Sequence, residues 1–106
     1  MPTTTYTVLR EATLRKQQIL AEYQGYVREM SPHVLGWKNG REKALFYQFA
    51  GESRSGLGAI GGPANWRCVF VDELDDVSVR DGDFFTAPTG PQRQTCVDEV
   101  DVEAPF

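Results

Sequence analysis

The sequence predicts a mainly β domain, a small barrel or sandwich of short antiparallel strands that follows one N-terminal helix. Turn signals recur every 10 to 11 residues or so in the first half, which is typical of short strands rather than of alternating strands and helices. The 106 residues are 41% hydrophobic and 25% charged, which is typical of one folded domain with one core. We therefore treat residues 1–106 as a single domain.

The helix is expected near the start of the chain, with Thr7 as its N-terminal cap and Lys16 near its end. Gln24-Gly25 and Lys38-Asn39-Gly40 are predicted hairpin turns, because Gly and Asn accept positive φ values. Ser31-Pro32 is expected to break the chain between two strands. The predicted strands cover residues 19–23, 26–30, 33–37, 43–49, 66–71, 77–80 and, as a last edge strand, 97–102.

Two further segments stand out by composition. Residues 51–65, GESRSGLGAIGGPAN, are rich in glycine and predict an exposed loop. We do not favour a phosphate-binding loop in this segment, because no GK[ST] sequence follows the glycines and no helix is predicted after the segment. The acidic end of the chain, 96–106, spreads its carboxylates along an extended strand, so we expect no metal site there.

The charges and the cysteines narrow the function classes. Fifteen acids against 11 bases give a net charge of −4, which argues against coating nucleic acid by bulk attraction but leaves room for a local basic site. The N-terminus lacks an apolar signal region and no run approaches a membrane span, so a cytoplasmic location without membrane contact is the default expectation. Cys68 and Cys96 are expected to be buried free thiols rather than a disulfide.

Catalysis is not expected, and neither is a cofactor. His33 is the only histidine, and the sequence contains no GxSxG, HExxH or Walker motif, so no common catalytic or metal-binding constellation can be assembled. His33 follows Pro32 and predicts a half-exposed histidine held by packing, with contact to a ligand as the alternative.

Arg28 and Arg67 are the better candidates for a binding site. Each lies in an otherwise apolar strand, where a guanidinium needs a carboxylate, a phosphate or water to satisfy its donors. From composition alone an internal salt bridge is the preferred interpretation, and an anion site is the alternative. Tyr47 and Trp37 add aromatic surface near these strands, although such residues are more often part of a core.

The order of these features resembles the WYL domain of bacterial transcription regulators. The resemblance spans residues 8–80 and rests on LREA (9–12), on Tyr23 at the end of a strand, on VREMSPHVLG (27–36) with Arg28 and Pro32, and on WRCVFVDELDDVSV (66–79). Ala44-Leu45-Phe46 stands in place of the Trp-Tyr-Leu motif that names the family, and Glu73 stands in place of an arginine. A helix-turn-helix does not precede the matching residues.

The resemblance implies an SH3-like or Sm-like β-barrel with an N-terminal helix. It also implies a non-catalytic sensor or accessory module that binds a small anionic ligand, a nucleotide or a short single-stranded nucleic acid. We place Arg28, His33, Tyr47 and Arg67 at its ligand site. Glu73 and the net acidity favour the small anion over nucleic acid. The rival hypothesis is a structural module that forms a homo-oligomer through a sheet edge or the 51–65 loop.

Overall fold

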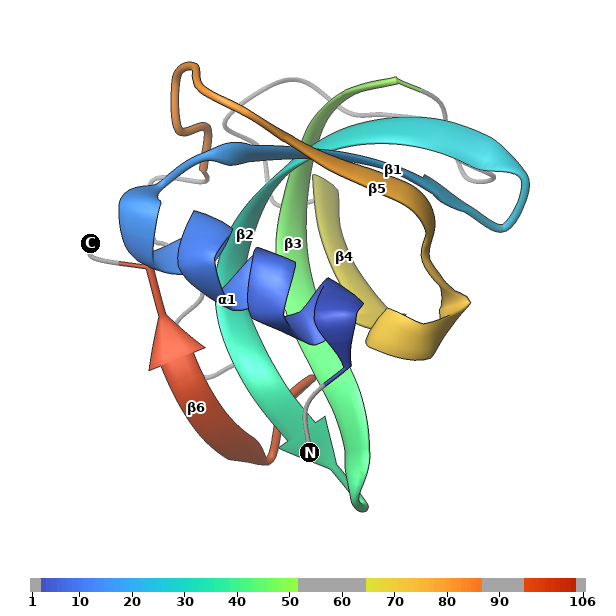
Figure 1. Cartoon of the computed structure of the whole chain (residues 1–106), viewed down its shortest axis with the longest axis vertical. Helices are drawn as coiled ribbons and strands as arrows, with labels where there is room; N and C mark the ends of the chain where they lie inside the picture. Colours follow the sequence, from blue (N-terminus) through green and yellow to red (C-terminus); the bar gives the residue numbers. More distant parts are fainter. Residues whose placement is uncertain (1–2, 52–64, 87–94, 105–106) are drawn as a thin grey trace.

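One helix and a six-stranded antiparallel sheet make up the computed structural model, which describes residues 3–51, 65–86 and 95–104 (Figure 1). The strand order is β4-β3-β2-β1-β5, and β6 pairs with β2 beyond the end of β1. The elements are α1 (Thr4–Arg15), β1 (Gln18–Tyr23), β2 (Tyr26–Lys38), β3 (Arg41–Gly51), β4 (Trp66–Phe70), a 3₁₀ turn η2 (Val71–Glu73), β5 (Asp75–Arg80) and β6 (Glu99–Glu103).

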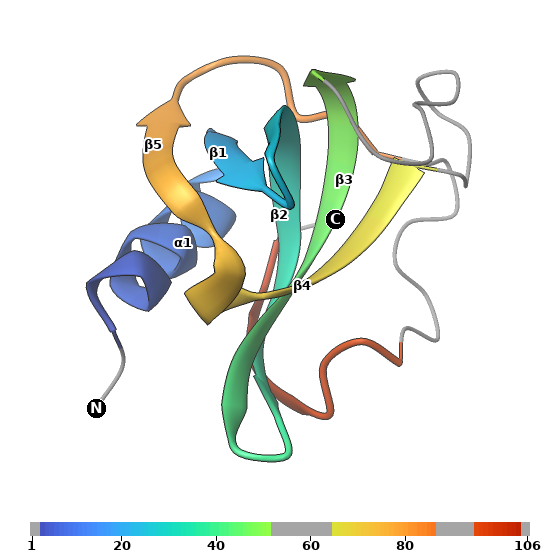
Figure 2. The same ribbon diagram turned by 90° about the vertical axis from the view of Figure 1, so that its right-hand side faces the viewer.

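The prediction of a mainly β domain with one N-terminal helix is confirmed. Within the described ranges, however, the end strands β4 and β5 do not pair with each other, so the sheet is curved but not closed into a barrel (Figure 2). No helix in these ranges is long and apolar enough to cross a membrane.

The helix begins one turn earlier than the sequence predicted. Thr3, not Thr7, is the N-cap, and its hydroxyl accepts a hydrogen bond from the Tyr6 amide at 3.1 Å. Glu42 of β3 accepts from the amide and the hydroxyl of Thr3, which fixes the cap to the sheet. The earlier start is explained by Tyr6, which is fully buried and stacks on the ring of Trp37. A helix starting at Thr7 would leave this aromatic anchor outside it.

Both predicted hairpin turns are confirmed. Gln24 and Gly25 have φ values of 54° and 80°, and Asn39 and Gly40 have values of 52° and 79°. Two successive positive φ values are the mark of a type I′ turn, whose twist matches that of the flanking strands. These turns set the registers of β1 with β2 and of β2 with β3.

The predicted break at Ser31-Pro32 is wrong, because β2 continues through both residues. Pro32 is tolerated at a point where the neighbours of β2 change. On one side β1 pairs as far as Met30 and β6 starts at Val34, so Pro32 has no paired residue there for an N–H to donate to. On the other side the register with β3 shifts between Pro32 and Val34.

Each face of the sheet carries its own core. The helix-side face packs against α1, with Leu9, Met30 and Phe46 among its fully buried residues. The opposite face, which we call the second face, is lined by Val34, Leu45, Cys96, Val97 and the partly buried Trp66. Side chains along β2 and β3 alternate between the faces except at the register shifts. Figure 2 shows α1 on one side of the curved sheet only.

The expectation of free thiols is wrong, because Cys68 and Cys96 form a disulfide with their Cα atoms 5.7 Å apart. Cys68 lies exposed on β4, and Cys96 is buried on the second face just before β6. The bond therefore ties the segment that leads into β6 to an end strand of the sheet. Strand-like surroundings do not reveal such proximity, because it depends on how the chain returns over the sheet.

Candidate functional site

Arg28 is a buried cation on the helix-side face. It lies on β2 opposite Ala21 of β1 and Gly51 of β3, two residues before the core residue Met30, and its exposed fraction is only 2%. Alternation along the strand thus sends the guanidinium inwards. A fully buried arginine is rare unless a carboxylate or another anion accompanies it.

The hydrogen bonds of Arg28 go to neutral oxygens. Its Nε donates to the carbonyl oxygen of Tyr23 and its Nη1 donates to Oε1 of Gln48, both at 3.3 Å. A guanidinium carries five N–H donors, so the described residues accept only part of what Arg28 offers. None of the ion pairs among the described residues involves Arg28.

Two tyrosine rings lie beside this guanidinium. The Cζ of Arg28 is 5.0 Å from the ring centroid of Tyr23 and 5.8 Å from that of Tyr26, which are cation–π distances. Tyr23 in turn donates a long hydrogen bond of 3.5 Å to Glu73, and burial raises the pKa of its hydroxyl. The π-electrons of the two rings therefore attract the guanidinium of Arg28, but neither ring supplies a full negative charge.

Arg67 faces the same side of the sheet. It pairs in register with Phe46, a residue of the helix-side core, and its Nη1 donates to the carbonyl oxygen of Trp66 at 3.1 Å. Burial lowers the pKa of Arg67. Burial also lowers the pKa of Arg28, and the positive charge of Arg67 lowers it further. The two arginines that the sequence singled out are thus close enough to repel each other.

Two residues that the sequence analysis did not assign to the site hold Arg28 in place. Gln48 accepts from Arg28 through Oε1 and donates from Nε2 to the carbonyl oxygen of Ala50, which fixes its amide. Gly51 has a φ of 86°, and a Cβ there would approach the Val27 carbonyl oxygen to 2.5 Å. A side chain at position 51 would therefore push β3 away from β2 beside Arg28. Recognising Gln48 requires the register of β2 and β3 with its shift, which the residue types do not reveal.

The other two predicted ligand residues, His33 and Tyr47, lie on the second face. His33 is 1% exposed, with its ring centroid 4.8 Å from that of Trp66 and 4.7 Å from that of Phe84. Tyr47 is fully buried, and its ring contacts the same Trp66 edge-on at 5.0 Å. Burial lowers the pKa of His33 to about 4, and the charge of Lys16 lowers it slightly. These residues form an aromatic cluster and are not part of the arginine site.

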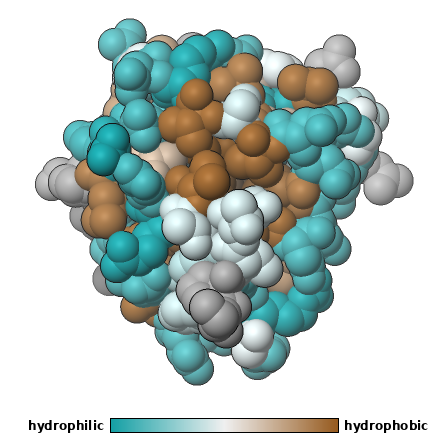
Figure 3. Space-filling model, in the orientation of Figure 1, coloured by the Kyte–Doolittle hydropathy of each residue, from teal (hydrophilic) through white to brown (hydrophobic). Residues whose placement is uncertain are grey.

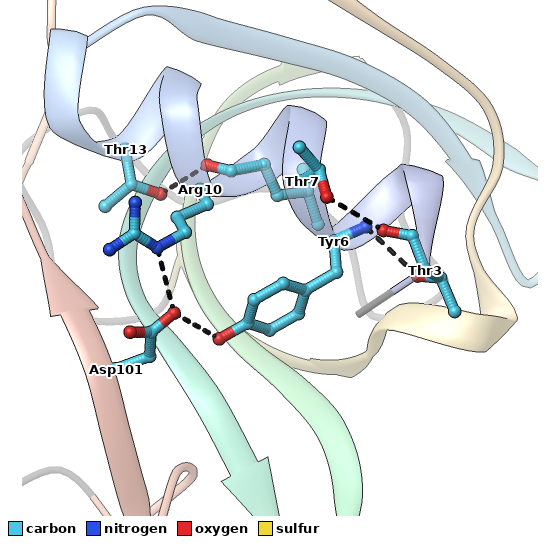
Figure 4. Close-up of polar contacts among 7 residues, drawn as sticks. Thr3, Tyr6, Thr7, Arg10, Thr13 and Asp101 are labelled. Carbon is cyan, nitrogen blue, oxygen red and sulfur yellow. Dashed lines mark hydrogen bonds and ion pairs between the residues drawn. The ribbon is translucent and has the colours of Figure 1, made fainter. Parts of the chain in front are cut away.

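A second polar cluster joins the helix to β6 (Figure 4). The Tyr6 hydroxyl donates to Oδ2 of Asp101 at 2.7 Å, and the Arg10 Nε donates to the same oxygen at 3.1 Å. Burial and the Asp101 carboxylate raise the pKa of Tyr6. Because every charge in this cluster is paired within the chain, we assign it to docking of α1 rather than to binding.

The arrangement around Arg28 and Arg67 is suited to holding a negative charge. Arg28 is buried on the same face as Arg67, whose charge lowers the pKa of Arg28 further; tyrosine rings flank Arg28, and Gln48 orients it. Comparison with known proteins adds no relative: the chain matches no family model, no curated protein and no solved structure.

Proposed function

We propose that the protein is a non-catalytic sensor or accessory module that binds a small anionic ligand through Arg28 and Arg67. The observation that carries this proposal is the burial of Arg28 beside a second cation, with only neutral oxygens as hydrogen-bond acceptors among the described residues. A carboxylate, phosphate or similar group would complete the donors of Arg28 and offset the repulsion between the arginines.

An internal salt bridge was the competing interpretation for Arg28. Every ion pair in the described part of the chain joins a carboxylate to a cation other than Arg28, such as Asp72 with Arg41, Glu29 with Arg80 and Asp101 with Arg10. Among the described residues, the groups that favour the charged form of Arg28 are the two tyrosines beside it. A buried charge that no carboxylate accompanies in the described part of the chain is costly, and such a cost is commonly retained where a ligand uses it.

The surroundings favour a small anion over a polyanion. Arg28 is only 2% exposed, so a continuous nucleic-acid backbone could not lie against its side chain. Glu73 lies at the outer end of Tyr23, and the chain carries a net charge of −4, so a run of phosphates would meet repulsion. Nucleotides and short single strands remain in the proposal as ligands that present one terminal phosphate.

We keep an SH3-like or Sm-like fold of the WYL type as part of the proposal, on the resemblance of residues 8–80 and the N-terminal helix, although the sheet of the described residues is open. The disulfide is evidence about the compartment in which the protein works. Bonds of this kind persist mainly in oxidising compartments, so Cys68–Cys96 weighs against the cytoplasmic location expected from the sequence.

A thermal-shift screen tests the proposal. The probes are inorganic phosphate, succinate, mononucleotides and short single-stranded oligonucleotides, each at low and moderate salt. A ligand at 100 times its Kd should raise the Tm of the wild type by about 10 °C, and salt should reduce the shift. Arg67→Ala should lose the shift. Arg41→Ala should keep it, because Arg41 is exposed and pairs with Asp72.

If no probe shifts the wild type and Arg67→Ala unfolds at a much lower temperature, Arg67 stabilises the strand and the binding proposal fails. The alternative function, a homo-oligomer formed through a sheet edge, would then lead, because β5 is exposed along its length. The rest of that alternative, the loop at 52–64, lies outside the described residues.

A further inference from the structure

We propose that β5 pairs with β5 of a second copy of this chain, in antiparallel orientation about a two-fold axis. β5 ends the path of the sheet and pairs with β1 along one edge only. Five of its six residues are exposed. Among the described residues no strand covers its other edge, which offers backbone donors and acceptors to an added strand. This inference does not depend on anion binding.

The register follows from symmetry. When a strand pairs with a copy of itself through one edge, opposed residues must point the same way, so a single residue lies on the axis. With Ser78 on the axis, Val77 opposes Val79 of the second copy and Asp76 opposes Arg80. With Val77 on the axis, Val79 would instead oppose Asp75. Both hydropathy and charge therefore select the register centred on Ser78.

The valines of this register are already on one face. Val79 pairs with the core residue Ile19 of β1 but remains 38% exposed, and Val77 packs partly buried against the helix-side core. Leu14 of α1 is 47% exposed. Figure 3 shows apolar side chains gathered on the face where Figure 1 places α1 and β5. Pairing of Val77 with Val79 would extend this apolar surface across the axis and shield it from water.

The charges explain why a second copy fits better than an unrelated strand. Asp76 lies at one end of the paired segment and Arg80 lies at the other, so antiparallel pairing in this register brings unlike charges together. Asp75 and Asp76 make no ion pair among the described residues. Arg80 already donates to Gln18 and Glu29, yet its side chain is 45% exposed and keeps further donors for a carboxylate of the second copy.

Asp76 limits the length of the pairing. Its φ of 50° is left-handed, and the register of β5 with β1 shifts beside it. The strand therefore bends away beyond this residue, and the regular contact covers residues 76–80. So short an interface predicts a weak, reversible dimer rather than an obligate one.

Sedimentation velocity over a concentration series tests the dimer. From about 10 µM to 1 mM, the weight-average mass should rise from 11.9 kDa towards twice that value. Val79→Lys should weaken association at least about 10-fold, because each copy then places a lysine beside the axis. Val100→Lys is the matched control, since Val100 is equally an exposed strand valine, at 43%, but lies on β6. It should associate as the wild type does.

A charge exchange tests the register and the identity of the partner. The single variants Asp76→Lys and Arg80→Glu should each be monomeric, and their mixture should form heterodimers. A thermal melt of each variant is recorded first, to show that the variant is folded. If Arg80→Glu does not fold, the comparison of Val79→Lys with the wild type tests the dimer instead. A wild type that stays monomeric at 1 mM or so overturns the proposal. So does a dimer that Val79→Lys leaves intact. Ligand shifts in Val79→Lys report separately on the anion site.

Discussion

Burial lowers the pKa of Arg28 on β2, and the positive charge of Arg67 on β4 lowers it further, although β3 separates the two residues in the sheet. Both side chains point to the helix-side face, because Arg28 pairs with Ala21 and Arg67 pairs with Phe46, which are both residues of that core. Like charges are normally kept apart in a core. The effect of these two neighbouring positive charges on the free energy of unfolding can be measured without knowing the ligand.

Arg28→Met should leave the ligand-free protein as stable as the wild type or make it more stable by about 1 to 2 kcal/mol. Methionine fills the space, removes a desolvated charge and ends the repulsion with Arg67. Urea unfolding measures this change. Arg41→Met is the control and should be neutral or slightly destabilising, because it loses the Asp72 pair and the contact with Phe70. A loss above about 3 kcal/mol in Arg28→Met would make Arg28 a structural residue.

His33 should make the protein less stable in mild acid. Its pKa is about 6.5 in the unfolded chain and about 4 in the folded one, so between these values the unfolded chain binds more protons. Stability is full above pH 6.5 and falls towards pH 4, by roughly 1 to 3 kcal/mol in total. The measurement is the difference in urea midpoint between wild type and His33→Phe at pH 7.5 and pH 4.5. Identical pH profiles would contradict the assignment.

The disulfide should contribute about 3 to 4 kcal/mol, which is the closure entropy of a loop between cysteines 28 residues apart. The Cys68→Ser and Cys96→Ser double variant, or the wild type in a dithiol reductant, should unfold at correspondingly lower urea. Intact mass after alkylation under native conditions should show no reactive thiol. Alkylation of the exposed Cys68 without prior reduction would show that the bond is not formed.

Tyr6→Phe should destabilise the protein by about 1.5 to 3 kcal/mol, because Asp101 loses a hydrogen bond to a buried hydroxyl. Tyr26→Phe is the matched control and should be nearly neutral, since Tyr26 is partly exposed and no hydrogen bond of its hydroxyl is found in the described residues. If both variants have the same urea midpoint as the wild type, the contact with Asp101 does not hold α1 on the sheet.

Local patterns in the sequence were sufficient for much of the fold. The turns at Gln24-Gly25 and Asn39-Gly40 could be predicted because positive φ values select the residues. The helix start was missed because Thr3 and Thr7 are both good caps, and only the packing of Tyr6 distinguishes them. The continuity of β2 through Pro32 was missed because it depends on two other strands meeting there.

The site could be predicted only in part. Arg28 and Arg67 stood out as charges in apolar strands, and they do share a face. His33 and Tyr47 could not be assigned to a face from sequence, because register shifts near both residues disturb the alternation. The disulfide depends on how the chain returns over the second face, and nothing in the local pattern of either cysteine encodes that return.

The most direct test of the anion site is NMR of the arginine side chains during titration with a ligand found in the thermal-shift screen. The Nε–Hε signal of Arg28 should be visible because the group is buried and bonded to the Tyr23 carbonyl. This signal and that of Arg67 should shift together and saturate with the same Kd, while the signal of Arg41 stays unchanged. Saturable binding that moves neither the Arg28 nor the Arg67 signal would show that the ligand binds elsewhere and that the two arginines are not an anion site.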